Sequence, residues 1–430
     1  MARTPSSFSV RTLCVRFPFL ALLAFAMLLT GCKGKPQGPY DLPDEDAWRQ
    51  IAPGENPFVE VTDEGAMRDI FVNAWDTKSN TLMEAMYLSS QWFKKPSSKS
   101  FYPIAGIEFD RAQKSVDRMI ELMNTSLSRD EFVEKALAEF TVYQTKGYNT
   151  KNETLFTAYC SVVLNGSMSP DDKYKYPLYK RPTDLATDPK TGQPLGRALP
   201  GGGYEPYPTR REIEESGMLA GTELVYLDSP LDAYIAQVNG SAKIRLTDGR
   251  PMYVGYHGKT DRPYKGLGAQ LKEQRLVPSS QLSLRGVRDY FRDHPEKQMD
   301  FIYNSEHYVF FKDYEGGDWP AGSLGFRVTE KRSLATDKTI FPRGSLMFVD
   351  TQIPTYESEF VPFRQLMLDQ DTGGAIRAAG RADIFMGIGK AAELIAGKQY
   401  RKGKMYYIFL KENTAQITPE SDSAPALAAR

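Results

Sequence analysis

Apolar residues recur at three- and four-residue steps in two stretches near the N-terminus, 63–94 and 109–143. Such spacing predicts amphipathic helices with one face toward a core. In the second stretch the apolar positions are Val116, Met119, Ile120, Met123, Phe132, Val133, Leu137 and Phe140. Ser128, followed by Asp130 and Glu131, predicts the N-cap of a second helix within that stretch.

From residue 154 onward the apolar residues fall into short, strand-like runs, the first being TLFTAYCSVVL (154–164). Further runs predict strands at 223–227, 233–238, 242–249, 251–258, 307–312, 323–328, 344–351 and 404–411. Asp248-Gly249 between two of these runs indicates a hairpin, helical spacing returns at about 280–292, and Pro, Gly and Lys predict a loop over 171–207. The chain is therefore expected to be mainly β with helices (α+β), with a middle part inserted into a domain made from both ends.

The N-terminus has the pattern of an export signal. Basic residues precede an apolar run at 17–29 that is too short to span a membrane, and Leu29-Thr30-Gly31-Cys32 follows. Residues 1–31 are predicted to be a lipoprotein signal peptide, with Cys32 as the lipidation site and anchor. The alternative is an ordinary signal peptide with a coincidental cysteine. Lys33 after the cysteine favours the outer membrane.

Composition narrows the remaining classes. Residues 32–57 read as a flexible tether, and the Thr-, Ala-, Pro- and Ser-containing tail at 413–430 as disordered. The chain has 54 Lys and Arg residues and 54 Asp and Glu residues, so it has no net positive charge that would attract nucleic acid. If Cys14 leaves with the signal and Cys32 is lipidated, Cys160 remains alone and no disulfide is expected. The scattered histidines (His257, His294, His307) match no zinc spacing, and neither a metal nor a cofactor is predicted.

Three aspartates carry the candidate chemistry: Asp337 in SLATDKTIFPRG, Asp371 in DTGGAI and Asp383 in RADIFMGIG. Few basic residues accompany these carboxylates in the sequence. The pattern predicts a site in which one carboxylic acid stays protonated and donates its proton to break a bond. Apolar neighbours of Asp383 are expected to raise its pKa.

Two other motifs are weaker. Asp371-Thr372-Gly373 is similar to an aspartic protease loop, but that mechanism needs two such loops and the chain has one. Gly387-Ile388-Gly389-Lys390-Ala391-Ala392, between a strand-like ADIFM and a helix-like KAAELIAG, fits a dinucleotide fingerprint. Only 38 residues follow it, too few for a nucleotide-binding unit. A tight strand-to-helix turn explains these glycines better.

Several blocks, in order, resemble the membrane-bound lytic murein transglycosylase A (MltA) family. LFTAYCSVVLNG and YPLYKRP (176–182) are similar to family blocks that read close to FTGYYEP and YPLYRRP, QVNGS (237–241) is similar to QVQGSG, and VGYHGKTDRPYKGLG (254–268) and YVFFK (308–312) also match. The three aspartate segments match the family's C-terminal three-aspartate (3D) domain. Two departures are expected to change sugar contacts: Cys160-Ser161-Val162 replaces Tyr-Glu-Pro, and Ala242 replaces a glycine.

The resemblance implies a double-psi β-barrel domain made from residues 58–161, with helices, and 314–412, the 3D domain. It implies a smaller β-rich domain inserted at 162–313 and a groove for a glycan strand between the two. Patterning along the chain gives the same division into two ends and a middle.

By the same resemblance, the protein is expected to be a lytic transglycosylase that cleaves the β-1,4 MurNAc-GlcNAc bond of peptidoglycan and forms 1,6-anhydro-MurNAc ends. Asp383 would be the general acid/base, with Asp371 and Asp337 in support. Substrate-binding residues would be Thr157, Tyr159, Gln237, Gly240 and Ser241.

Expected partners are peptidoglycan glycan strands, the membrane through the lipid anchor, and cell-wall enzyme complexes; nucleic acid is not expected. The expected location is the outer membrane, facing the periplasm. The alternative function is a non-catalytic lipoprotein that binds glycan or scaffolds other wall enzymes, which the departures at 160–162 would favour and the three aspartates oppose.

Overall fold

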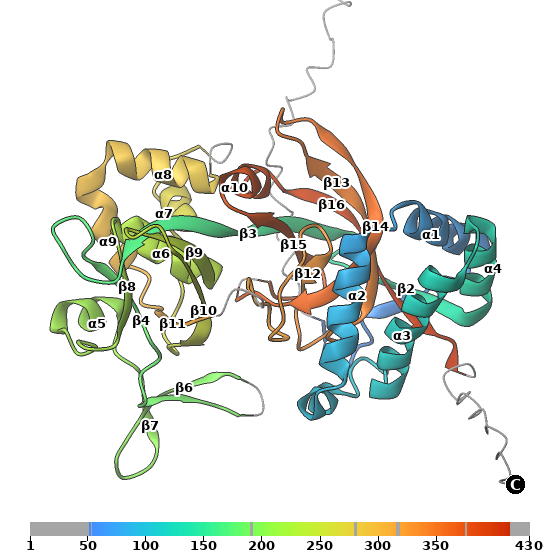
Figure 1. Cartoon of the computed structure of the whole chain (residues 1–430), viewed down its shortest axis with the longest axis horizontal. Helices are drawn as coiled ribbons and strands as arrows, with labels where there is room; N and C mark the ends of the chain where they lie inside the picture. The colour runs from blue at the N-terminus through green and yellow to red at the C-terminus, as the bar shows by residue number, and fades with distance from the viewer. Residues whose placement is uncertain are drawn as a thin grey trace, which may run out of the picture. The chain divides into compact units, whose positions relative to one another are not determined.

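The computed structural model describes residues 51–52, 54–189, 192–278, 282–314, 319–374 and 376–412. The predicted signal peptide, the lipidation of Cys32, most of the tether and the tail at 413–430 lie outside these residues. Within them, mixed helix and sheet confirm the α+β class, with most of the sheet in one extended network (Figure 1).

The first part of the described chain is mainly helical. They are α1 (Glu64–Asp76), α2 (Asn80–Phe93), the 3₁₀ helix η2 (Pro96–Phe101), α3 (Phe109–Thr125) and α4 (Arg129–Glu139). Ser128 caps α4 as predicted, because its side chain accepts a hydrogen bond from the Glu131 N–H at 3.1 Å. Asp63 and Ser79 cap α1 and α2 in the same way.

Two flanking strands and a ring of six make up the main sheet of this part; β1 precedes the helices and the other strands follow them. The strands are β1 (Phe58–Glu60), β2 (Phe140–Thr145), β3 (Thr154–Ser167), β12 (Ser333–Ala335), β13 (Leu346–Pro354), β14 (Phe360–Asp371), β15 (Arg381–Ile388) and β16 (Arg401–Leu410). Strands β16, β13, β14, β12, β15 and β3 are hydrogen-bonded in that order, and β3 pairs again with β16, which closes the ring. The pairs β12–β14 and β15–β3 are parallel. Helices α1 and α2 contact β14, α3 contacts β16, and α10 (Lys390–Ala396) contacts β3 and β15.

The second part of the chain forms smaller sheets with short helices. Its elements are β4 (Tyr176–Tyr179), β5 (Leu185–Thr187), β6 (Pro194–Ala198), β7 (Tyr204–Glu205), α5 (Arg210–Ser216), β8 (Glu223–Leu227), α6 (Pro230–Asn239), β9 (Ser241–Leu246), β10 (Pro251–Lys259), α7 (Leu267–Glu273), α8 (Leu284–Asp293), the 3₁₀ helix η4 (Pro295–Lys297), α9 (Gln298–Tyr303) and β11 (Val309–Asp313). Strands β9, β10 and β11 pair antiparallel, and the predicted hairpin at Asp248-Gly249 joins β9 to β10, with Gly249 at φ +84°.

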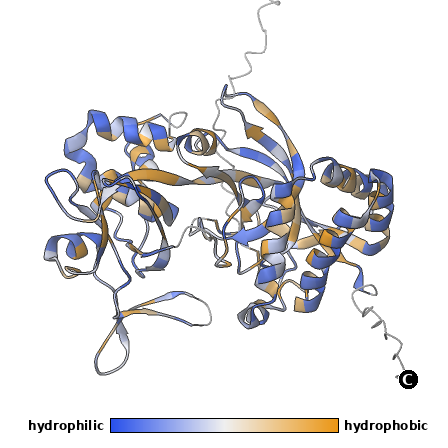
Figure 2. Ribbon diagram, viewed as in Figure 1, coloured by the Kyte–Doolittle hydropathy of each residue, from blue (hydrophilic) through white to orange (hydrophobic). Residues whose placement is uncertain are grey.

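Strand β3 connects the two parts. Its residues 155–161 pair with β15, and its residues 162–166 pair with β9. The change of partner falls between Ser161 and Val162. Apolar residues run along β3 through both parts (Figure 2), and Phe156, Val162 and Leu164 are buried. Burial of side chains of this size contributes roughly 1.5–3 kcal/mol each.

Four of the predicted elements are wrong. Residues 233–238 lie in α6, where Ser229 is the N-cap, Pro230 the first residue and Gly240 the left-handed C-cap; these end signals outweigh the strand-like composition. Residues 323–328 form a turn with Gly325 at φ +73°. The expected loop at 171–207 contains β4 to β7, because tertiary pairing such as β4 with β8 overrides Pro and Gly content. The helical pattern predicted over 109–143 ends at Glu139, the last residue of α4, and β2 begins with buried Phe140.

Candidate active site

Four residues lie in one row across adjacent strands of the ring. Ala335 on β12 pairs with Asp371 of β14 on one side and with Asp383 of β15 on the other, and Asp383 pairs with Thr157 of β3. Directly paired residues project to the same face of a sheet. Asp371 and Asp383 are two strand spacings apart, roughly 10 Å between Cα atoms. Sheet pairing thus brings together two of the three predicted aspartates and predicted Thr157.

Asp383 keeps one carboxylate oxygen available. The Thr157 hydroxyl donates to Oδ1 at 2.8 Å, and no described residue forms a hydrogen bond with Oδ2. The side chain is half-buried, between buried Ala382 and Ile384. Burial raises the pKa of Asp383 to about 6; the Asp371 charge also raises it, while Thr157 and Arg381 oppose the rise. A carboxyl group with this pKa and a free oxygen can give and take a proton near neutral pH.

Arg381 belongs to this site but was not predicted from the sequence. Its Nη2 donates to the Thr157 hydroxyl at 3.3 Å, and that hydroxyl donates to Asp383. Arg381 is buried and lies two residues before Asp383 on β15, so both side chains project to the same face. Arg381 lies just before the strand-like run ADIFM, and its link to Asp383 passes through Thr157 of β3, so no local signal in the sequence identifies it.

Both carboxylate oxygens of Asp371 accept hydrogen bonds. Its Oδ2 accepts from the Tyr159 hydroxyl at 2.6 Å, and its Oδ1 accepts from the backbone N–H groups of Thr372 at 2.8 Å and Ser323 at 2.9 Å. Burial raises the pKa of Asp371, and these three donors and the Lys338 charge oppose the rise. Burial also raises the pKa of Tyr159 well above its usual range, so it remains a neutral donor. The predicted pair Asp371 and Tyr159 is therefore in direct contact.

Asp337 makes different contacts. It is 2% exposed, its Oδ1 accepts from the backbone N–H of Thr339 at 3.0 Å and from its hydroxyl at 2.7 Å, and its Oδ2 accepts from the Ala378 N–H at 2.9 Å. Arg377 lies 3.5 Å from Oδ1. The carboxylate holds the segment between β14 and β15, where Ala378 has φ +80°.

The remaining predicted binding residues lie on the side of α6 and β9. The Ser241 hydroxyl is 2.8 Å from that of Ser161 on β3, four residues beyond Thr157. Gly240 ends α6 at φ +67°. Gln237 is 4% exposed and its Oε1 accepts from Arg210, so its side chain belongs to a buried network. Gln237 is not brought to the aspartate pair by any hydrogen bond of the described residues.

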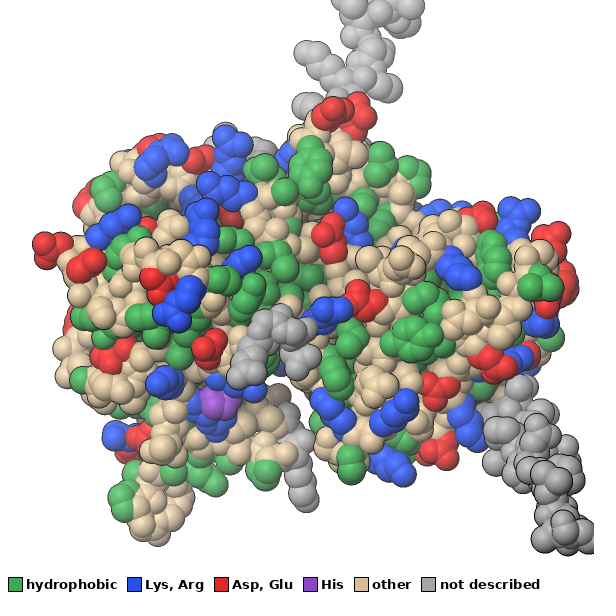
Figure 3. All heavy atoms as spheres, viewed as in Figure 1, with side chains coloured by type: hydrophobic (Ala, Val, Ile, Leu, Met, Phe, Trp, Pro, Cys, Tyr) green, Lys and Arg blue, Asp and Glu red, His purple; other side chains and the backbone are tan. Residues whose placement is uncertain are grey.

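Within the described ranges, no group of three or more His, Cys, Asp or Glu side chains could hold a metal ion. Cys160 is a free, buried thiol. No described helix combines the length and apolar character needed to cross a membrane. Basic and acidic side chains are interspersed on the face shown in Figure 3, in keeping with the zero net charge.

Comparison with known proteins gives matches over both parts of the chain. The profile of the MltA specific insert domain matches residues 155–312, and that of the 3D domain matches residues 332–409. The membrane-bound lytic murein transglycosylase A of Vibrio cholerae is 27% identical over 287 residues, which are 65% of this chain and 72% of that protein.

Solved structures share the fold. A membrane-bound lytic murein transglycosylase from Agrobacterium tumefaciens has a TM-score of 0.67 at 23% identity, over 82% of this chain and 97% of that one. Escherichia coli MltA with bound chitohexaose has a TM-score of 0.58 at 19% identity, over 82% of this chain and 94% of that one. Matches to both domain profiles, together with these relatives, show that the chain belongs to the membrane-bound lytic murein transglycosylase A family with a 3D domain.

Proposed function

We propose that this protein is a lytic transglycosylase that cleaves the β-1,4 bond between MurNAc and GlcNAc in peptidoglycan and leaves 1,6-anhydro-MurNAc ends. Membership of the family supports this proposal, as do relatives named lytic murein transglycosylases. The observation that carries it is the half-buried Asp383 carboxyl group, two strands from Asp371, with a pKa of about 6 and one oxygen to which no described residue donates a hydrogen bond.

The proposed reaction needs one acid that works twice. Protonated Asp383 gives its proton to the glycosidic oxygen, and the bond from that oxygen to C1 of MurNAc breaks. The C6 hydroxyl of the same sugar attacks C1, and its proton returns to the Asp383 carboxylate. The acid is regenerated, no water is consumed, and the intramolecular attack gains from its high effective concentration.

Asp371 would act as a fixed negative charge. Both its oxygens accept hydrogen bonds, which suits stabilisation of positive charge at C1 and not attack on carbon. Its charge also raises the pKa of Asp383. Thr157 would orient the acid and Tyr159 would hold Asp371, both at the sugar-binding face. Asp337 would support the site by holding the segment around Ala378.

The finer architecture and location complete the proposal. The ring would be a double-psi β-barrel from residues 58–161 and 314–412, with 162–313 inserted and a glycan groove between them, where Gly240 and Ser241 would contact sugar. The oligosaccharide in the E. coli structure supports a glycan ligand. Lipid on Cys32 would anchor the protein to the outer membrane, facing the periplasm, where cell-wall enzymes would be further partners.

The test uses purified murein and analysis of the products by mass. The protein beginning at Cys32, without lipid, should release muropeptides with 1,6-anhydro ends, and Asp383→Asn should lower the rate by about 10²–10⁴-fold while murein binding persists. Products with reducing ends would identify a hydrolase instead. Binding without products would support the glycan-binding scaffold and contradict the proposal.

A further inference from the structure

Residues 319–323 connect the β9–β10–β11 sheet to the aspartate pair. At one end, Trp319 is 6% exposed, and its indole Nε1 donates to the Val254 carbonyl on β10 at 3.0 Å. Its ring lies 5.0 Å from that of Tyr253, centroid to centroid. A buried indole with its donor satisfied anchors this end of the segment to β10.

The other end of the segment is bonded to Asp371. The Ser323 N–H donates to Asp371 Oδ1, the Gly322 N–H donates to the Phe326 carbonyl at 2.8 Å, and the Val328 N–H donates to the Pro320 carbonyl at 2.7 Å. These bonds make residues 320–328 a closed turn.

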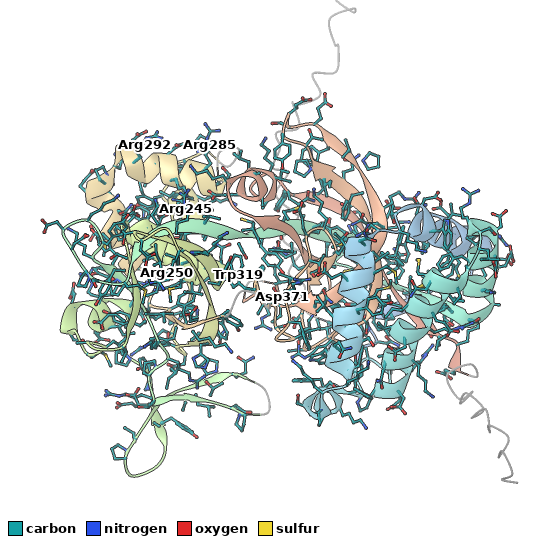
Figure 4. All side chains as sticks on the ribbon, in the orientation of Figure 1. Arg245, Arg250, Arg285, Arg292, Trp319 and Asp371 are labelled. Carbon is teal, nitrogen blue, oxygen red and sulfur yellow. The ribbon has the colours of Figure 1, made fainter. Side chains whose placement is uncertain are left out.

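This turn packs directly on the end of β14. A Cβ at Gly322 would lie 2.8 Å from the Gln370 carbonyl oxygen and 3.3 Å from Asp371 Cγ, so a side chain there would displace the turn. Figure 4 labels Trp319 and Asp371 near the middle of the view, with Trp319 toward β10 and β11.

We propose that Trp319 is a positioning residue for Asp371: by anchoring residues 319–323 on β10, it presents the Ser323 N–H to the Asp371 carboxylate. The inference rests on the proposed function, because it assigns Asp371 a role in sugar chemistry. A backbone N–H aimed at a carboxylate favours the ionised form. If the anchor is lost, the segment can shift, and among the described residues Asp371 keeps its bonds from Thr372 and Tyr159.

In the part of the chain that the structure describes, three titratable side chains face Asp371 in addition to the Ser323 backbone N–H. Tyr159 of β3 donates to it, Asp383 of β15 interacts with it through charge, and Lys338, after β12, favours its ionised form. None of these contacts passes through Trp319. A change that follows loss of the indole can therefore be assigned to residues 319–323.

The experiment compares Trp319→Phe, which keeps an aromatic ring and removes the indole donor, with the wild-type protein. Trp92→Phe is the matched control, since Trp92 is 3% exposed and packs on Phe93 and Phe101 in the helical part. Readouts are kcat and KM on soluble glycan strands from pH 4 to 8, and the titration of the Asp371 carboxyl carbon by ¹³C NMR. Unfolding in urea checks that each variant is folded.

Trp319→Phe should lower kcat by about two- to tenfold, the equivalent of one neutral hydrogen bond, with KM unchanged. The pKa of Asp371 should rise, and the fall of kcat/KM with rising pH should begin at a lower pH. Trp92→Phe should change none of these. If Trp319→Phe titrates Asp371 as the wild type does, or if both variants shift it equally, the inference is wrong. A wild-type protein that makes no anhydro products would overturn the proposed function, whereas the NMR titration would still decide the role of Trp319.

Discussion

The Asp383 carboxyl group combines a proposed catalytic role with a cost to folding. It is half-buried on β15, with one hydrogen bond from Thr157 and a like charge on Asp371. Replacement by Asn keeps the shape of the side chain and a carbonyl oxygen for the Thr157 hydroxyl, but removes the ionisable proton. We expect Asp383→Asn to make the protein more stable at neutral pH while it loses activity.

The size of the effect follows from the pKa. Asp383 ionises at about 6 in the folded protein, against an ordinary value of 3.8. At about 1.36 kcal/mol per pKa unit, the difference corresponds to about 3 kcal/mol, and solvent screening of a partly exposed group reduces it to about 1–2 kcal/mol. Because the pKa of Asp383 is raised in the folded protein, the stabilising contribution of its protonated form is fully present below pH 3.8. This contribution is lost as the pH rises through about 6. The Asn variant escapes this loss.

The assay is urea unfolding of wild type and variant at pH 3.5 and at pH 7.5. At pH 7.5 the midpoint for Asp383→Asn should be higher, with an unchanged slope, by the equivalent of about 1–2 kcal/mol. At pH 3.5, where the wild-type carboxyl is already largely neutral, the two midpoints should nearly coincide. Comparison at each pH separately cancels the titration of every other group.

Asp337→Asn is the matched control. Asp337 is a buried aspartate two residues after β12, and three hydrogen bonds and Arg377 hold its carboxylate. Its replacement should lower stability by about 1–3 kcal/mol, the opposite sign. The reasoning is refuted if Asp383→Asn is less stable than the wild type at pH 7.5, or if its advantage is the same at both pH values.

Further predictions concern pH and the buried charges. Wild-type kcat/KM on murein should fall as pH rises through about 6, because Asp383 loses its proton. Thr157→Val removes a hydrogen bond that favours the Asp383 carboxylate, so the fall in kcat/KM should move to higher pH. Asp371→Asn removes a like charge, so the fall should move to lower pH. A shift in the reverse direction would contradict the reasoning in either case. Lys338→Met leaves buried Asp369 without its ammonium partner and should cost about 3–5 kcal/mol in urea unfolding. Adding Asp369→Leu should recover much of that loss, and failure to do so would show that packing, not charge, is responsible.

Local signals identified several elements well. Ser128 and the apolar spacing after it predicted α4, and Asp248-Gly249 predicted the hairpin between β9 and β10, because caps and tight turns depend on residues within a few positions. The same reasoning failed for α6, where a run of buried apolar residues resembles a strand although Ser229, Pro230 and Gly240 mark the ends of a helix.

The pairing of strands far apart in the chain could not be predicted from the sequence. The short strands β4 to β7 form within residues rich in Pro and Gly because partners outside or across that segment supply hydrogen bonds. Arg381 could not be placed beside Asp383 until β15 was known to pair with β3, since their link passes through the Thr157 hydroxyl. The hydrogen bond from Ser323 to Asp371 could not be predicted either, because its donor is a backbone N–H, which every residue except proline has.

The sequence by itself determined the α+β class, the family resemblance and the three aspartates. These depend on residue identity, spacing and order along the chain. Only the tertiary structure decided how the aspartates differ: Asp371 and Asp383 meet across Ala335 with different hydrogen-bond donors, whereas Asp337 holds the segment around Ala378. The physical reason is that burial, the number of donors and neighbouring charge set a carboxyl group's pKa, and all three arise from strands far apart in the chain.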